Sequence, residues 1–253
     1  MRIFLKTEDE IILLRAASQL ATRALIEVGR HVVPRLALSH LRNKVVNAVM
    51  RTVPTESNSG KEALSSDTEF TFFVNGAYIE PSLEGECMLC EGDWLTVNCW
   101  VCLDGYYSFG AHTFIVGSSQ DDEPMISTLR DMLRQVVRRA SAGHSIKEMS
   151  RTVYSLHSHD PYVLQKTFGH GVGRNRVENP ILRMNPGVND TVLLKEGMCL
   201  VIALAFMHGR SHFIKPRLMH ESTFHNPFVP FGTTVVVRPG RPEILTSFET
   251  IVK

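Results

Sequence analysis

The chain has 253 residues, of which 43% are hydrophobic and 21% are charged, and its formal net charge at pH 7 is +1. This length can bury a sizeable core, and the near-neutral charge excludes a whole-molecule attraction to nucleic acid or to an anionic membrane. No apolar run approaches the roughly 20 residues that cross a bilayer.

The cysteines and the first residues indicate the compartment. Five cysteines, an odd number, do not suggest a disulfide framework. The opening residues MRIFLKTEDE turn acidic at once and lack the apolar segment of a signal peptide. We therefore expect a reduced, cytoplasmic protein that has no nucleic-acid or membrane partner.

Two helices are predicted at the start of the chain. Thr7 and Glu10 have the spacing of a capping box, and apolar residues then recur at helical spacing up to Gly29, which is a plausible helix end. A second helix is predicted over residues 39–53. The residues 54–67, rich in Ser, Thr and Glu, predict a loop.

Strands follow, and the same order then repeats. The predicted strands of the first half cover residues 70–74, 94–103 and 106–116. Asp104-Gly105, between the last two strands, is a two-residue hairpin signal. In the second half, helices are predicted at residues 125–140 and 145–156, and strands at residues 163–168, 199–206, 233–238 and 243–246. The repetition predicts a duplicated α+β half in one compact domain over residues 1–253.

Four segments carry a family resemblance. They are VNGAYIEP at residues 74–81, EGDWLTVNCWVCLDGYYSFGAHTFIVG at 91–117, GHGVGRNRVENP at 169–180 and LKEGMCLVIALAF at 194–206. In this order and spacing the chain resembles the methionine aminopeptidases of metallopeptidase family M24 over nearly its whole length. The resemblance implies the pita-bread (creatinase/aminopeptidase) fold, in which pseudo-twofold halves share a curved antiparallel sheet with flanking helices.

The resemblance also implies where metal ligands would lie. Such enzymes hold two metal ions with two aspartates, one histidine and two glutamates. The matching positions in this sequence carry Asn98, Phe109, His170, Ala203 and Gly232. A paired metal site needs deprotonated oxygen ligands beside the imidazole, and of the expected ligands the histidine alone is kept. We therefore expect a reshaped, more apolar cavity that folds without metal or another cofactor.

His170 is the strongest candidate for a working side chain in this cavity. It lies between Gly169 and Gly171, so the backbone leaves it access to the cavity. With an unperturbed pKa of about 6.5, an imidazole can act as a general acid or base without metal. A structural role, held by hydrogen bonds in a well-packed turn, is equally open.

Other candidate pocket positions follow from the same resemblance. Two further catalytic histidines of the family would fall at Glu80 and Val177. Arg176 stands where the family places an aromatic wall, and it could pair with a ligand carboxylate or phosphate, or with Glu178. His112 is three residues from Phe109 on a predicted strand, so we expect it to point to the other face.

Three side-chain groupings have ordinary interpretations. Cys99 and Cys102 lie in a predicted strand and point to opposite faces, so buried or loop thiols are favoured over a zinc site shared with Cys87 and Cys90. A relocated metal site is conceivable in a loop with four histidines, although hydrogen-bonding or solvent-facing roles are favoured: His208, His212, His220 and His225. A solvated helix face is favoured for four arginines at helical spacing: Arg130, Arg134, Arg138 and Arg139.

These observations lead to three functional hypotheses. In the first, a metal-independent central cavity binds, and could transform, a small organic molecule or a peptide. Catalysis through His170, Asn98, backbone donors and positioning would suit cyclisation, isomerisation, dehydration or pericyclic reactions better than amide hydrolysis. The second hypothesis is a catalytically inactive pseudo-peptidase that acts as a protein-interaction module. The third is an active, metal-dependent methionine aminopeptidase.

Overall fold

The computed structural model describes residues 2–53, 64, 66–117, 124–157, 163–164, 166–185, 192–207, 228–247 and 251. The first half contains α1 (Glu8–His31), α2 (Leu38–Thr52), β1 (Glu69–Val74), β2 (Ala77–Ile79), the short 3-10 helix η2 (Pro81–Leu83), β3 (Trp94–Leu103) and β4 (Tyr106–Ile115). The second half contains α3 (Pro124–Arg138), α4 (Ile146–His157), β5 (Val163–Leu164), β6 (Thr167–Gly171), β7 (Glu178–Arg183), β8 (Cys199–Met207), β9 (Phe228–Val236) and β10 (Glu243–Ile244). Among the described helices, none combines the length and the apolarity that a membrane span requires.

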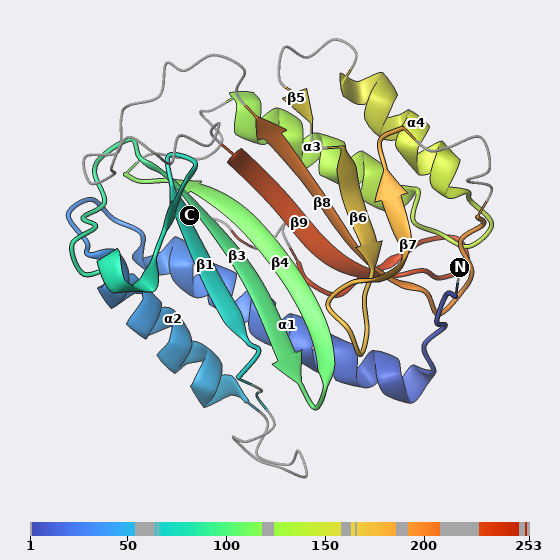
Figure 1. Cartoon of the computed structure of the whole chain (residues 1–253), viewed down its shortest axis with the longest axis horizontal. Coiled ribbons are helices and arrows are strands. Elements are labelled where there is room, and N and C mark those ends of the chain that lie inside the picture. The colour runs from blue at the N-terminus through green and yellow to red at the C-terminus, as the bar shows by residue number, and fades with distance from the viewer. Residues whose placement is uncertain are drawn as a thin grey trace.

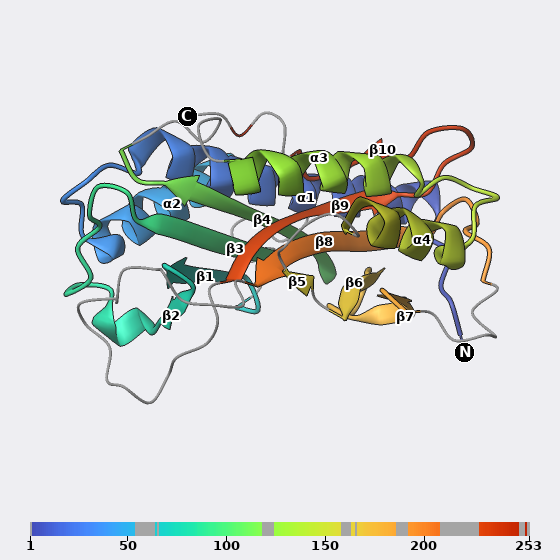
Figure 2. The same cartoon turned by 90° about the horizontal axis from the view of Figure 1, so that it is seen from above.

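One antiparallel sheet of ten strands organises these elements, in the order β2-β1-β3-β4-β9-β8-β6-β7, with β10 beside β9 and β5 beside β8. The sheet is curved, and the helices lie on its convex side (Figures 1 and 2). Helices α1 and α2 cover the half that contains β1, β3 and β4, and α3 and α4 cover the half that contains β8 and β9. The arrangement confirms the predicted α+β class and the repeated order of helices and strands.

The packing between sheet and helices explains why the concave face is free to carry a site. One hydrophobic cluster joins α1 and α2 to the first half of the sheet and contains Leu25, Phe72 and Phe114. A second cluster joins α3 and α4 to the other half and contains Leu133 and Phe206. Because side chains alternate between the two faces of a strand, the neighbours of these residues point away from the helices.

Local sequence signals placed several elements correctly. The capping box is confirmed, since the Glu10 amide donates to Thr7 Oγ1 at 3.3 Å and the Thr7 amide donates to the Glu10 carboxylate at 3.0 Å. Asp104 and Gly105 form the predicted hairpin turn, with φ of 49° and 76°. Helix α1 continues past Gly29 because the amide of Val32 still donates to the carbonyl of Val28 at 2.8 Å.

Two strands were missed by the sequence prediction. Strand β2 is three residues long and follows a turn at Asn75 and Gly76, both with positive φ. Strand β7 contains Pro180, which disfavours a central strand but is tolerated at a sheet edge, and β7 is the outermost strand on its side. The strand predicted over residues 163–168 divides into β5 and β6, and β6 extends to Gly171.

A buried ion pair fixes the N-terminal segment against the loop between β6 and β7. Lys6 Nζ donates to Glu178 Oε2 at 2.5 Å, and the two side chains are 4% and 5% exposed. The Lys6 amide donates to the carbonyl of Gly197 at 2.8 Å, and Glu178 Oε1 accepts from the Asn175 amide at 3.2 Å. The pair therefore joins the start of the chain to the segment that follows His170.

Substitution of one partner of this pair should be strongly destabilising. Lys6→Met leaves Glu178 as a buried carboxylate without its cation, so the free energy of unfolding should fall by about 3–5 kcal/mol in urea denaturation. The double variant Lys6→Met/Glu178→Leu should recover most of that loss. Asp131→Asn, which removes an exposed ion pair with Arg134, should cost less than about 1 kcal/mol. If Lys6→Met and Asp131→Asn lowered the free energy of unfolding equally, the Lys6–Glu178 ion pair would not be the buried contact described above.

Candidate functional site

The strand register brings together the positions at which the family resemblance places metal ligands. Asn98 of β3 lies opposite Ala111 of β4, and Ala111 lies opposite Gly232 of β9. Gly232 in turn lies opposite Ala203 of β8, and His170 of β6 lies opposite Val201, two residues from Ala203. Directly opposed residues share a face of the sheet. Together with Trp100 these residues form the concave-face site: Asn98, Trp100, Phe109, His170, Ala203 and Gly232.

Hydrophobic packing shows which face of the sheet this is. Val97 and Phe114, which alternate with Asn98 and Phe109, belong to the cluster beneath α1 and α2. His112 is fully buried on that helix side, with its ring 4.6 Å from the rings of Phe114 and Phe231. The expectation that His112 points away from Phe109 is therefore confirmed. The concave-face site lies on the opposite side of the sheet, where none of the described helices packs.

The ring of Phe109 occupies the space beside Gly232 and Ala203. A Cβ built on Gly232 would lie 2.6 Å from Phe109 Cε1 and 3.1 Å from the Cβ of Ala203. Phe109 is 8% exposed, and its ring lies 4.8 Å from that of Trp100 at 45°. The three residues are thus complementary in shape, because the aromatic ring needs the room that the glycine leaves.

His170 presents one ring nitrogen to the site. Its Nδ1 lies 2.8 Å from the carbonyl oxygen of Gly171, so Nδ1 carries the proton and Nε2 is the acceptor. Burial lowers the pKa of His170 from the ordinary 6.5, and the hydrogen bond to Gly171 opposes part of this shift. The imidazole is therefore mainly neutral at pH 7, and its ring is stacked on that of Trp100 with centroids 6.1 Å apart.

The glycines on either side of His170 have a packing role of their own. A Cβ on Gly169 would lie 2.2 Å from the carbonyl oxygen of Val201, and one on Gly171 would lie 2.4 Å from that of Asn179. These glycines let β6 approach its neighbours β8 and β7 closely. The GHG sequence is thus explained by close strand packing, whatever the role of the imidazole.

Asn98 carries a polar atom that lacks a partner in the described part of the chain. Its Oδ1 is buried and accepts no hydrogen bond from any described residue. A buried carbonyl oxygen without a donor costs about 1–3 kcal/mol. The site therefore has a place for an N–H or O–H donor from a ligand or a water molecule.

The side chains at these positions do not fit a pair of divalent cations. Asn98 supplies a neutral amide oxygen and His170 supplies one imidazole nitrogen, whereas Phe109, Ala203 and Gly232 supply no side-chain donor. Paired metal ions require several carboxylate oxygens. Throughout the described ranges, no three His, Cys, Asp or Glu side chains are grouped so that they could hold a metal ion.

Arg176 lies at the edge of this site and has partners at the start of β1 and just before it. Its guanidinium donates to Glu69 Oε2 at 2.8 Å and to the carbonyl of Asp67, and it lies 5.6 Å from the centre of the Trp100 ring. The alternative pairing with Glu178 was wrong, because Glu178 is engaged by Lys6 in the buried ion pair. The role of Arg176 toward a ligand stays a prediction.

The remaining candidates lie farther from the centre of the site or outside the described residues. Val177 is 59% exposed, and Glu80 is exposed directly after β2, the outermost strand on that side of the sheet. Cys99 is buried beneath α1 and α2, whereas Cys102 lies opposite Tyr107 on the other face. The histidines at 208, 212, 220 and 225 lie outside the described residues.

Sequence reasoning did not single out Trp100. It lies two residues after Asn98 on β3, so the same alternation that placed Asn98 could have identified it. Its ring contacts those of Phe109 and His170 and the guanidinium of Arg176. Trp100 thus connects the polar and the apolar parts of the concave-face site.

Comparison with known proteins decides the family. The model of metallopeptidase family M24 matches residues 12–240 of the chain. The chain belongs to this family. The methionine aminopeptidase of Borreliella burgdorferi is 24% identical over 97% of this chain and 98% of its own length.

Solved structures of M24 relatives confirm the pita-bread fold. The methionine aminopeptidase of Thermotoga maritima aligns with a TM-score of 0.79 and 21% identity, over 97% of this chain and all of that chain. The N-terminal domain of the FACT complex subunit SPT16 from chickpea aligns with a TM-score of 0.71 and 16% identity, over 98% of this chain and 60% of that chain. This M24 chain therefore shares its fold both with a methionine aminopeptidase and with a domain of a FACT complex subunit.

The fit between Phe109 and Gly232 can be tested by paired substitution. Gly232→Ala should lower the free energy of unfolding by about 1–3 kcal/mol, because the added methyl overlaps the Phe109 ring. In the background of Phe109→Leu the same substitution should cost at least about 1 kcal/mol less. Gly85→Ala is a matched control, since a Cβ there meets nothing within 4 Å. Additive effects of the two substitutions in chemical denaturation would show that the contact is absent.

Protonation of His170 should oppose folding. Its pKa is lower in the folded protein than the ordinary 6.5, so the folded state binds fewer protons than the unfolded state just below that pH. Its protonation state therefore has no effect on stability well above pH 6.5, and a penalty grows as the pH falls toward the folded pKa. His170→Gln should remove this penalty, so that the stability of the wild type relative to the variant falls between pH 7 and pH 5. If the free energy of unfolding of the wild type instead rose relative to that of His170→Gln on acidification, the lowered pKa of His170 would be contradicted.

Proposed function

We propose that this M24 family member binds a small organic molecule or a peptide at the concave-face site without a pair of metal ions. The observation that carries the proposal is the packing of the Phe109 ring against Gly232 and Ala203. At those positions the family resemblance calls for carboxylate ligands. A carboxylate side chain at position 232 would overlap the Phe109 ring, so the space there suits an apolar contact.

The chemistry of the site favours a neutral or donor-rich ligand with a flat apolar part. The Trp100 ring offers an aromatic surface, and the Nε2 of His170 and the buried Oδ1 of Asn98 offer hydrogen-bond acceptors. These are few polar groups within an apolar surround, which is the usual composition of a small-molecule site. Such a ligand would satisfy the orphaned Asn98 oxygen.

Any chemistry at this site would depend on the imidazole. Nδ1 of His170 is engaged by Gly171, so a proton would be taken up at Nε2. The lowered pKa keeps His170 in its neutral, basic form at pH 7. Together with Asn98, backbone donors and positioning in a largely apolar site, this base suits cyclisation, isomerisation or dehydration better than amide hydrolysis, and positioning alone suits pericyclic steps.

A protein-interaction module is the second candidate function. The same fold occurs in the N-terminal domain of SPT16, which is named as a subunit of the FACT complex. A metal-dependent methionine aminopeptidase is the third candidate, because the similar curated proteins bear that name. The three candidates differ in what stabilises the protein: a small ligand, a partner protein or a divalent cation.

A thermal-shift screen in the presence of EDTA tests the proposal. A bound small molecule or short peptide at 100 times its Kd should stabilise the wild type by about 2.7 kcal/mol. His170→Ala and Trp100→Ala should each lose that stabilisation, whereas His144→Ala, an exposed histidine on the helix side of the second half, should keep it. A requirement for added Mn²⁺ or Co²⁺, or release of methionine from a short peptide, would favour the aminopeptidase. Recovery of a stoichiometric partner without any small-molecule response would favour the interaction module.

A further inference from the structure

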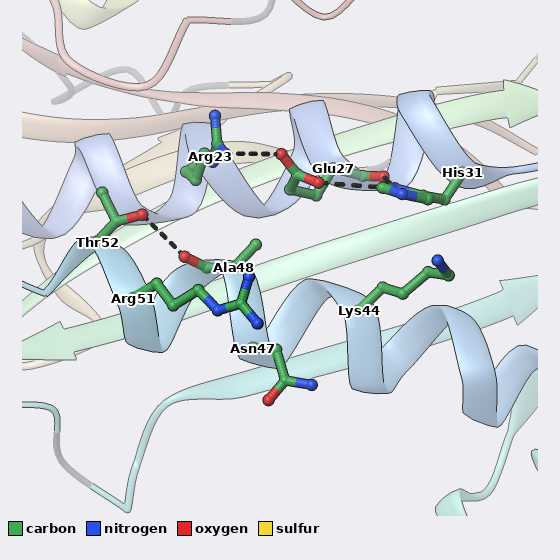
Figure 3. Close-up of a pocket in the computed structure, with 8 residues that line it drawn as sticks. All are labelled: Arg23, Glu27, His31, Lys44, Asn47, Ala48, Arg51 and Thr52. Atoms are coloured by element: carbon green, nitrogen blue, oxygen red, sulfur yellow. Dashed lines mark hydrogen bonds and ion pairs between the residues drawn. The ribbon is translucent and has the colours of Figure 1, made fainter.

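A pocket of about 330 Å³ lies between α1 and α2, away from the concave-face site (Figure 3). The two helices run antiparallel, so Arg23 of α1 lies near Arg51 of α2 at one end, and His31 lies near Lys44 at the other (Figure 3). Ala48 lies between Lys44 and Arg51 along α2, and its short side chain leaves room there. The sheet separates this pocket from His170 and Trp100.

The lining of the pocket is predominantly cationic. Arg23, Lys44 and Arg51 contribute positive charge, and Glu27 contributes the one carboxylate among the lining residues. Glu27 is already compensated, since its Oε1 lies 3.0 Å from Arg23 and 2.8 Å from Arg30, and its side chain is 8% exposed. An incoming anion would therefore meet an excess of positive charge.

Several of these donors have no acceptor. Among the described residues, no hydrogen bond or ion pair engages the side chains of Lys44 and Arg51, both of which are exposed. Nε of Arg23 is buried and likewise has no acceptor within the described ranges. A buried N–H without an acceptor carries a desolvation cost of about 1–3 kcal/mol.

The spacing of the free cations indicates the shape of the ligand. Lys44 and Arg51 are seven residues apart, which corresponds to two helical turns and about 10 Å along the axis. A compact monoanion offers one charge to these two cations, whereas an ion with two charged centres offers one charge to each. We propose that this pocket binds a small oxyanion with two adjacent charged centres, with the chemistry of a diphosphate.

Such chemistry could come from free pyrophosphate or from the diphosphate of a nucleotide. The pocket volume of about 330 Å³ is near the lower limit of small-molecule sites. Arg51 would engage phosphate oxygens through several N–H groups, and Lys44 would act as a point charge at the other end. Arg23 already pairs with Glu27, so it would contribute mainly its positive charge. The Asn47 amide, which also lines the pocket, adds a neutral donor, whereas the Thr52 hydroxyl donates its proton to the carbonyl of Ala48 at 2.8 Å.

Isothermal titration calorimetry at constant ionic strength tests this proposal with the full chain. Pyrophosphate should bind at least about tenfold more tightly than orthophosphate, and ADP shows whether a nucleoside is tolerated on the same diphosphate. Lys44→Gln and Arg51→Gln should each weaken pyrophosphate binding about tenfold, because each removes a charge-assisted contact. Arg51→Lys, which keeps the charge, should weaken pyrophosphate binding less than Arg51→Gln does.

Two further variants separate this pocket from general basicity. Ala48→Leu keeps every charge and suits a helix, but it fills the space between Lys44 and Arg51, so it should abolish binding. Arg138→Gln alters a second basic pocket, formed by α3 and residues 240–244, and should leave binding unchanged. Circular dichroism melting verifies that each variant is folded.

The proposal would be overturned by any of four results. Pyrophosphate and orthophosphate could bind equally, which would show only a diffuse attraction to positive charge. Binding could persist unchanged in Ala48→Leu or Arg51→Gln, or it could be lost in Arg138→Gln, which would place the ligand elsewhere. Absence of pyrophosphate binding at millimolar concentration would exclude the site altogether.

Discussion

The packing of one aromatic ring sets the character of the concave face. Phe109 lies where a side chain on Gly232 would have to lie, with Ala203 beside it. Its ring also supports Trp100, and Trp100 stacks on the imidazole of His170. A change at any of these positions would therefore be felt by the others, because close-packed interiors transmit displacement. The face is organised by apolar contact, with two neutral polar groups at its centre.

The curved sheet separates two chemically different environments. Within the concave-face site, the side-chain acceptors are the His170 ring nitrogen and the Asn98 amide oxygen, and both are neutral at pH 7. On the helix side, the groove between α1 and α2 presents the cationic groups of Lys44 and Arg51, for which the described part of the chain supplies no acceptor. A ligand that suits one side is a poor match for the other. Ligand binding at the concave-face site and at the pocket between α1 and α2 can therefore be tested with separate substitutions in the same chain.

Sequence predicted the elements whose signals are local and missed the contacts that join distant segments. The capping box at Thr7 and the turn at Asp104 depend on neighbouring residues, so their patterns sufficed. Strand β7 was missed because Pro180 disfavours a strand unless its place at the sheet edge is known. The Lys6–Glu178 pair joins residues 172 positions apart, and the Arg176–Glu69 pair joins residues 107 positions apart. No periodicity of either segment encodes such partners.

We propose that the concave face is an apolar-lined site that binds no pair of metal ions. The most direct measurement is an anomalous-difference map from crystals grown with excess Mn²⁺. We predict no pair of cation peaks among Asn98, Phe109, His170, Ala203 and Gly232. Two Mn²⁺ peaks about 3.5–4 Å apart at that place, with His170 as one ligand, would contradict the account.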